Sequence, residues 1–342
     1  MDLVTGGTGI VGSHLLFELV SAGRRVRALY RKGSDRSIME RVFRHYSPNA
    51  NKLLQHIEWV EGDLLDVAAL AEAMTGVEHI YHAAAVVSFD PRKADEMYSA
   101  NTQGTARVVD AALAPGPSTG SGRRRLCHVS STAAIGWAPP GIERDETLPW
   151  VDDKRTSDYA RSKYQAEMEV QRGIAEGLDA VIVNPCVILG PGVSGRSSMS
   201  LVERVHRGTR WYSSGSNAFV DARDVAACMV VLMERGESGE RYLLVGENAT
   251  YEKLFRELSI ALGKPVPTSL ASTWLLGLAW RLERIRSLVT RSSPLVTRAT
   301  VQSSITLRSY SNKKVKALLG YNFRTLAESA ANVSAFVSGA GR

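Results

Sequence analysis

Glycines at positions 6, 9 and 12 join a short apolar run to a helical pattern, and this feature constrains the fold most. Gly6 permits a tight turn, Gly9 lets the backbone approach a pyrophosphate, and Gly12 lets the helix pack against the strand. The free N–H groups at the helix start favour an anion. We therefore predict a dinucleotide-binding loop here, not merely a tight turn. Its contact residues are Gly6, Thr8, Gly9, Ile10, Val11 and Gly12.

The first half of the chain alternates strand and helix patterns. This alternation predicts an α/β fold, a Rossmann-type doubly wound parallel sheet with helices on both faces. The expected strands are Leu3–Thr5, Arg25–Tyr30, Ile57–Val60, Glu78–His82, Arg125–Val129 and Ala180–Asn184. The expected helices are Val11–Ala22, Ser34–His45, Asp66–Met74, Ala94–Ala114 and Ser157–Glu176.

The alternation decays after about residue 185, which predicts a smaller mixed C-terminal lobe for the substrate. We assign residues 1–185 to the cofactor domain and 186–342 mainly to the lobe, with about 218–246 as a candidate return to the sheet. The glycine, proline and serine residues of 115–122 predict a surface loop. Expected lobe elements are a helix Leu201–Arg207, a strand Tyr242–Val245, and helices near 250–262, 271–289, 312–319 and 325–337.

The end of the second strand bears on the choice of cofactor. An acidic residue there would accept hydrogen bonds from the ribose hydroxyls of NAD. This chain has Tyr30, Arg31 and Lys32 instead. Arginine binds a 2′-phosphate bidentately, so we expect NADP(H) to be preferred, with NAD(H) left open. Arg31 is the better candidate and Lys32 the weaker. Asp63 and Leu64 follow the third strand, where a carboxylate can meet adenine or simply cap a helix.

Composition narrows the function classes. The net charge is +7, but the basic residues are dispersed and no nucleic-acid motif accompanies them, so we expect no nucleic-acid partner. No stretch reaches the roughly 20 apolar residues of a membrane span. Cys127, Cys186 and Cys228 are scattered, without metal-ligand spacing. That pattern fits a reducing cytoplasm and predicts no metal site.

Tyr159 and Lys163 begin a predicted helix, and a spacing of four places both on one face. A cation about 4 Å away favours the phenolate by about 4 kcal/mol at an effective dielectric of about 20. That effect would bring a pKa near 10 toward neutrality, where acid–base catalysis works best. Taken alone, the pair would be read as an ordinary surface contact.

Polar residues at neighbouring strand ends favour the catalytic interpretation. Ser130, Ser131 and Thr132 end the fifth strand, at the sheet edge where ligands bind. One hydroxyl there can orient a substrate oxygen, while another serves a turn or a cap. Asn101 lies on the preceding helix, where its amide can hold backbone or water near Lys163, or simply pack.

Together these residues resemble a known family, the extended short-chain dehydrogenase/reductases. The matching segments are Thr5–Gly12, Gly62–Leu64, His82–Ala85, Asn101–Thr105, Val129–Ala133, Tyr159–Lys163, Asn184–Pro185, Gly190–Pro191, Phe219–Ala226, and a tail at Ser311–Lys314 and Leu319–Tyr321. The resemblance implies catalytic roles for Tyr159, Lys163, Thr132 and Asn101. It implies cofactor contacts from Asp63, Leu64, Ala83, Ala84, Ala85, Ser130, Tyr159, Lys163, Pro185 and Val187.

Two positions distinguish branches of this family. Nucleotide-sugar epimerases usually have an asparagine at the position of Val187 and an arginine at the position of Asn217, and both residues anchor the anionic substrate. Arg31 and the apolar candidates look more like dihydroflavonol reductases and 3β-hydroxysteroid dehydrogenases. That likeness implies hydride transfer at the carbonyl or alcohol of a small apolar cyclic substrate. Asn184 departs from the arginine that is common at its position.

Candidate substrate contacts are aromatic and small polar residues in loops, namely Ser88, Phe89, Trp137 and Trp211. The apolar helix from Ser272 to Leu282 fits lobe packing or a dimer contact better than a membrane surface. The alternatives left open are a nucleotide-sugar epimerase or dehydratase with tightly held NAD(P), and a non-catalytic NADP-sensing protein. The chain is expected to be a homodimer or a monomer.

Overall fold

A seven-stranded parallel sheet forms the centre of the computed structural model, which describes residues 1–114, 124–139, 141–154, 156–195, 198–290, 292, 294 and 296–339. The strand order is β10-β6-β5-β4-β1-β2-β3. The strands are β1 (Asp2–Thr5), β2 (Val26–Tyr30), β3 (Ile57–Glu61), β4 (His79–His82), β5 (Arg125–Val129), β6 (Asp179–Pro185) and β10 (Arg241–Leu244). The order reverses between β1 and β4, which is where open α/β sheets bind ligands. The predicted fold class is confirmed, and the predicted 115–122 loop lies outside the described residues.

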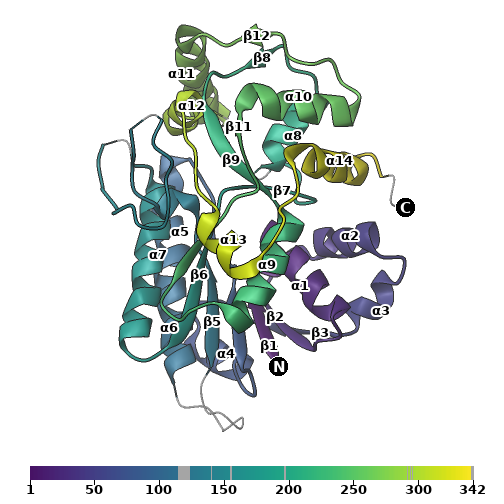
Figure 1. Ribbon diagram of the computed structural model, residues 1–342, viewed down its shortest axis with the longest axis vertical. Coiled ribbons are helices and arrows are strands. Elements are labelled where there is room, and N and C mark those ends of the chain that lie inside the picture. Colours follow the sequence, from purple (N-terminus) through teal and green to yellow (C-terminus); the bar gives the residue numbers. More distant parts are fainter. Residues whose placement is uncertain are drawn as a thin grey trace.

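Alternate residues of the central strands supply two separate cores, and helices lie on both sides of the sheet (Figure 1). Val4 packs with residues of α1 (Ile10–Ser21) and α9 (Ala222–Arg235), whereas its neighbour Leu3 packs on the opposite face. That second core contains residues of α4 (Val67–Ala73), α6 (Gly104–Leu113) and α7 (Asp158–Ala175). A strand that is apolar on both faces is typical of a parallel sheet covered by two helical layers.

The segment expected to form one helix from Ala94 to Ala114 is interrupted. It consists of α5 (Ala94–Met97), a π-helical turn η2 (Tyr98–Gln103) and α6. Asn101 lies in the wide turn and is buried. A single π-helical turn inside an α-helix is frequent at functional sites, and here it places the asparagine inside the protein.

A smaller lobe continues from the carboxyl ends of the strands. It contains a sheet of β7 (Val187–Leu189), β9 (Ser216–Asp221) and β11 (Glu247–Thr250), and a two-stranded sheet of β8 (Trp211–Tyr212) and β12 (Ser269–Leu270). Its core joins α8 (Met199–His206), α10 (Tyr251–Leu262) and α14 (Leu326–Val337). Strand β10 pairs with β6 in the central sheet, whereas β9 belongs to the lobe.

The remaining elements complete the layers. These are α2 (Ser37–Tyr46), α3 (Ala50–Leu54), η1 (Pro91–Lys93), η3 (Thr132–Ala134), α11 (Thr273–Thr290), α12 (Arg298–Ile305) and α13 (Lys313–Leu319). Within the described part of the chain, none of the helices combines the length and the hydropathy that a transmembrane span requires.

Candidate active site

The phosphate loop has the close packing that its glycines predict. Gly6 has φ +74°, and a Cβ there would lie 2.6 Å from the backbone of Ala84. A Cβ on Gly12 would lie 2.7 Å from the carbonyl carbon of Gly6. Gly9 precedes the first turn of α1, and a Cβ there would meet only the Gly6 oxygen, at 3.3 Å. The loop therefore leaves room for a ligand beside Gly9 and at the start of the helix.

The loop after β4 lies against the same turn. The amide of Ala83 donates to the Thr5 carbonyl (3.2 Å), and that of Ala84 donates to the Thr5 hydroxyl (3.3 Å). The buried ring of His82 hydrogen-bonds both Thr5 Oγ1 (2.7 Å) and Thr105 Oγ1 (2.9 Å). Ala85, next along the chain, is exposed. These contacts fix β1 and β4 at the reversal point of the sheet.

A cavity of about 790 Å³ opens beside the phosphate loop. Thr8, Arg31, Lys32 and Asp63 are among the residues that line it. Both basic side chains are exposed. The cavity therefore combines a glycine cradle with cations at the end of β2, and these residues fit a dinucleotide that carries a further phosphate.

Asp63 and Leu64 occupy the turn after β3. The carboxylate of Asp63 accepts the amide of Leu65 at 2.9 Å, while Asp66 caps α4. Leu64 packs against Gly104, where an added Cβ would be 3.1 Å from its side chain. The helix-cap alternative for Asp63 is therefore wrong, and its carboxylate remains at the cavity wall.

Tyr159 lies in the first turn of α7 beside an aromatic loop residue. Its ring is 5.9 Å from that of Phe89, in an edge-to-face arrangement. Burial raises the pKa of Tyr159, and a hydrogen bond with Ser131 lowers it in part. The hydroxyl next to Tyr159 thus belongs to Ser131, whereas the sequence favoured Thr132, which is buried in η3.

In this structure Lys163 is bonded to the backbone of β5, and the pKa of Tyr159 lies above its ordinary value, not below it as predicted. Its ammonium is buried and donates to the Val129 carbonyl at 2.8 Å. Burial lowers the pKa of Lys163 to about 8, and the Glu167 carboxylate opposes that shift. The predicted lowering of the Tyr159 pKa is therefore wrong for this structure, because burial outweighs the other influences on the phenol.

A polar cluster centred on the buried Glu167 lies one helical turn beyond Lys163. The carboxylate accepts hydrogen bonds from Ser130 Oγ (2.6 Å) and Asn184 Nδ2 (3.0 Å), and Arg241 Nη1 lies 3.4 Å away. Ser130 is a predicted cofactor contact, but its hydroxyl donates its proton to the Glu167 carboxylate and not to a ligand. An arginine is common in the family at the position of Asn184, and here Arg241 on β10 supplies a positive charge to Glu167 instead.

Asn101 holds the loop that follows β4. Its Oδ1 accepts the amide of Val86 at 2.7 Å, and its Nδ2 donates to the Val86 carbonyl at 2.9 Å and to Ser162 Oγ at 3.0 Å. Ser162 directly precedes Lys163 in α7. Asn101 therefore links this loop to the helix that carries the tyrosine and lysine.

The remaining predicted contacts lie in several different elements of the fold. Pro185 ends β6 and is buried, and Val187 begins β7. Ser88 accepts the amide of Asp90 in the loop that carries Phe89. Trp137 is half exposed after η3. Trp211 lies on β8 beside Arg210, so its described contacts place it with the lobe surface and not with Tyr159.

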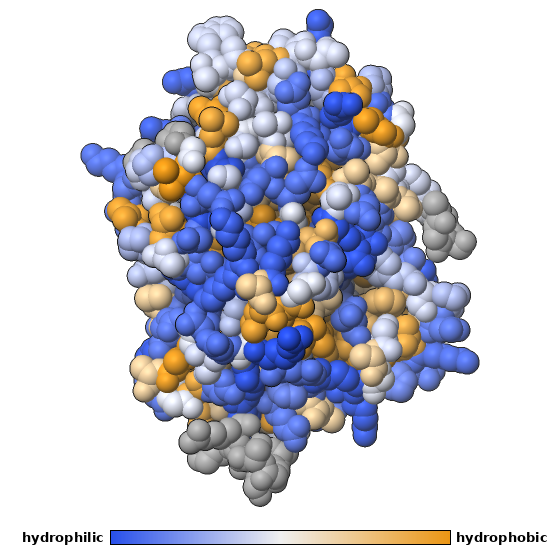
Figure 2. All heavy atoms as spheres, viewed as in Figure 1, coloured by the Kyte–Doolittle hydropathy of each residue, from blue (hydrophilic) through white to orange (hydrophobic). Residues whose placement is uncertain are grey.

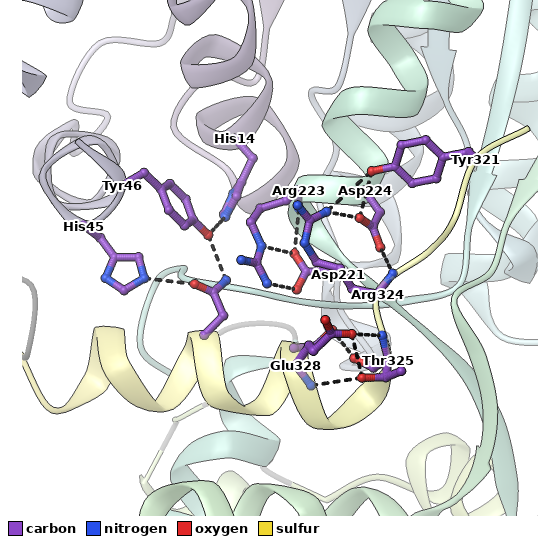
Figure 3. A network of polar contacts seen from close by, with 12 residues as sticks. His14, His45, Tyr46, Asp221, Arg223, Asp224, Tyr321, Arg324, Thr325 and Glu328 are labelled. Carbon is purple, nitrogen blue, oxygen red and sulfur yellow. Dashed lines mark hydrogen bonds and ion pairs between the residues drawn. The ribbon is translucent and has the colours of Figure 1, made fainter. Parts of the chain in front are cut away.

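A polar network behind the phosphate loop joins α1 to the C-terminal helix (Figure 3). His14 Nε2 is 2.9 Å from the Tyr46 hydroxyl, which also accepts a hydrogen bond from Asn332 of α14. Burial lowers the pKa of His14 to about 4, so the ring is neutral at neutral pH. Nearby, Asp224 accepts the amide of Arg324 at 2.8 Å. The helix that begins at the phosphate loop is thus fixed to the end of the chain.

Sequence reasoning missed three residues of this region. Ser131 received no role, because the resemblance gave the catalytic role to Thr132 and a cofactor contact to Ser130; in the structure Ser131 caps η3. Glu167 lies four residues after Lys163, so helical spacing alone would have placed it on the same face. Arg36 stacks over Tyr30 and Trp59, with its guanidinium carbon 5.0 and 5.2 Å from the ring centres. A third cation therefore lies near Arg31 and Lys32.

Comparison with known proteins gives a consistent result. The profile described as the NAD dependent epimerase/dehydratase family matches residues 3–245. Sterol demethylase protein B of Methylococcus capsulatus is 33% identical over 270 residues, which cover 78% of this chain and 75% of that protein. A putative dihydroflavonol 4-reductase of Synechocystis sp. is 32% identical over 297 residues, covering 84% and 80%.

Solved structures agree with this fold over the whole chain. The crystal structure of gox2253 has 32% identity and a TM-score of 0.79, covering 100% of this chain and 99% of that one. DesIV, a dTDP-glucose 4,6-dehydratase from Streptomyces venezuelae with NAD and TYD bound, has 22% identity and a TM-score of 0.75, covering 99% and 97%. At that identity the second similarity shows the fold alone.

Proposed function

The chain belongs to the NAD dependent epimerase/dehydratase family, as an extended short-chain oxidoreductase, and from this premise we propose that it reduces a ketone on an apolar cyclic substrate with NADPH. The observation that carries the proposal is the position of Tyr159. Its hydroxyl lies near enough to Ser131 for that residue to lower its pKa in part, its ring contacts Phe89, and Lys163 lies one turn along the same helix. The reverse oxidation of the alcohol would use the same groups.

NADP(H) would be held by the glycine loop and by the cavity beside it. The start of α1 would receive the pyrophosphate, and Arg31 and Lys32 would bind the 2′-phosphate. Asp63 lines the same cavity, where its carboxylate can accept a hydrogen bond from adenine. When bound, the cofactor supplies the hydride for carbonyl reduction.

Tyr159 would supply the proton. Because burial raises its pKa, the hydroxyl stays protonated at neutral pH and can donate to a carbonyl oxygen that gains negative charge. The Ser131 hydroxyl would hold the oxygen of the substrate or of Tyr159 in place. Protonated Lys163 would stabilise the phenolate that develops as the proton leaves. Asn101 would position the helix turn between them through Ser162.

The surroundings of Tyr159 favour an apolar substrate. Val87, Phe89 and Trp137 are apolar side chains in the loops after β4 and β5, and they are 40–48% exposed. Val187 and Asn217 are both uncharged, so the two positions that anchor the substrate in nucleotide-sugar epimerases offer no positive charge to a nucleotide diphosphate. Relatives named for a sterol and for a dihydroflavonol support a ring-bearing substrate of this kind.

Cofactor affinity tests the proposal at its first step. We expect the protein to bind NADPH more tightly than NADH, and Arg31→Ala to weaken NADPH binding about 10- to 150-fold, since a charge-assisted hydrogen bond contributes about 1.5–3 kcal/mol. NADH binding should change little. Arg25→Ala, an exposed arginine before β2, serves as the matched control. Tighter binding of NADH by the unaltered protein would contradict the cofactor assignment.

A further inference from the structure

Helix α11 presents a row of apolar side chains to solvent. Trp274, Leu278, Leu282, Ile285 and Val289 are between 38% and 78% exposed. At about 100° per residue they fall within an arc of about 80° on the helix surface. We call this row the α11 stripe. The lobe-packing alternative from the sequence is therefore wrong for this face, because its side chains point away from the lobe.

Basic residues accompany the α11 stripe, and acidic residues do not. Counted around the helix from Trp274, Arg281 lies about 20° outside one edge of the stripe and Arg286 about 40° outside the other. Arg284 lies about 80° from the edge that Arg281 flanks. The one acid of α11, Glu283, is on the opposite side, where its side chain is 13% exposed and pairs with Arg286. The exposed face is thus apolar and cationic, the combination found in helices that lie in a membrane interface.

The opposite face of α11 is hydrogen-bonded to Arg92, which follows the loop that carries Phe89. Arg92, paired with Asp90, donates to Ser287 Oγ at 3.0 Å and to the Ser292 carbonyl at 2.8 Å. Phe89 of the same loop is the residue whose ring contacts Tyr159. Figure 2, drawn from the same side as Figure 1, shows hydrophobic residues scattered among hydrophilic ones at the end where α11 lies. The stripe is therefore connected to the substrate side of the protein.

We propose that the α11 stripe binds the surface of a membrane that contains anionic lipids, so that the protein takes an apolar substrate from the bilayer. The charge of the face selects this occupant over a second copy of the chain. Two α11 stripes related by a two-fold axis would bring the Arg281 residues that flank them toward one another, with no acid in either stripe to compensate. The membrane surface supplies the missing negative charge. Capture of a substrate from the bilayer rests on the proposed function, whereas binding to the membrane does not.

Flotation with lipid vesicles tests the proposal. The full-length protein is mixed, without cofactor or substrate, with vesicles of phosphatidylcholine alone or with about 30% phosphatidylglycerol. We expect strong binding to the anionic vesicles at low salt and weak binding to the neutral ones. Arg281→Gln with Arg284→Gln should lower the partition coefficient about 30-fold, at about fivefold for each charge. Leu282→Ser with Val289→Ser should lower it about 100-fold.

Val67→Ser with Val151→Ser is the matched control, because it removes two exposed valines that lie outside α11. Unchanged circular dichroism and NADPH binding establish that each variant folds. The proposal is overturned if the parent does not bind anionic vesicles, if the Leu282 and Val289 variant binds like the control, or if sedimentation shows a dimer that this variant converts to a monomer. Vesicle binding without any ketone reduction would contradict the proposed function alone.

Discussion

Removing the charge of Glu167 should change the pH at which the protein works. Glu167→Gln keeps an acceptor for the bonds from Ser130 and Asn184 but removes the negative charge one helical turn from Lys163. Because that charge raises the pKa of Lys163, its loss leaves the opposing effect of burial unbalanced. The lysine should therefore release its proton at a lower pH.

The size of this effect follows from the helix geometry. Side chains four residues apart lie about 6 Å from one another. At an effective dielectric of about 20, two unit charges at this distance interact by about 3 kcal/mol. That energy equals about a hundredfold change in proton affinity. The pKa of Lys163, about 8 in the parent, should fall below neutrality in the variant.

The assay is the pH profile of kcat/KM for ketone reduction at saturating NADPH. If protonated Lys163 stabilises the phenolate of Tyr159, parent activity falls above about pH 8, and the variant loses activity about two pH units earlier. Glu169→Gln is the matched control on the same helix, since Glu169 pairs with Arg172 at the surface. A Glu167→Gln profile that superimposes on the parent profile would refute this account of Lys163.

Two further predictions concern the fold that supports the site. Gly12→Ala should destabilise the protein by about 3 kcal/mol, because the new Cβ meets the backbone of Gly6 and Gly7. Gly9→Ala should fold normally but bind NADPH more weakly. Thermal unfolding and nucleotide titration separate the two effects, and equal stability of both variants would argue against the packing role of Gly12. Burial holds the pKa of His128 well below 6.5, so below that pH the unfolded chain binds a proton that the folded one does not, and stability falls with falling pH. His128→Leu should remove about 1.4 kcal/mol of that loss per pH unit. It should also raise the free energy of unfolding at neutral pH by about 1–3 kcal/mol, because both ring nitrogens lack a described partner. Urea unfolding at pH 7 and pH 5 measures both effects, and a loss of stability between these pH values equal to that of the parent would count against the prediction.

The parts of the site that were predictable are those fixed by local geometry. The spacing of Gly6, Gly9 and Gly12 requires a strand, a tight turn and a helix, and the structure has all three. The alternation of elements likewise led to the parallel sheet. The positions of Arg31 and Asp63 at the cavity follow from that topology, because Arg31 follows β2 and Asp63 follows β3 at the same edge of the sheet.

Non-local contacts decided what the sequence left open. Three adjacent hydroxyls look alike in sequence, but Ser130 meets Glu167, whereas Ser131, in extended backbone, lies near Tyr159. Adjacent residues of an extended chain point in opposite directions. The direction of the Lys163 ammonium depends on the Val129 carbonyl, 34 residues away. Similarly, whether the apolar side of α11 is covered depends on the whole lobe, and no pattern within the helix could show it.

The most direct test of the central claim is NADPH consumption with a panel of apolar cyclic ketones, measured for the parent and for Tyr159→Phe. The account predicts turnover by the parent, one alcohol formed for each NADPH oxidised, and a loss of at least about 100-fold in the variant, which still binds NADPH. Because phenylalanine keeps the ring that contacts Phe89, the loss would report the hydroxyl. Turnover by Tyr159→Phe at the parent rate would contradict the claim that Tyr159 supplies the proton.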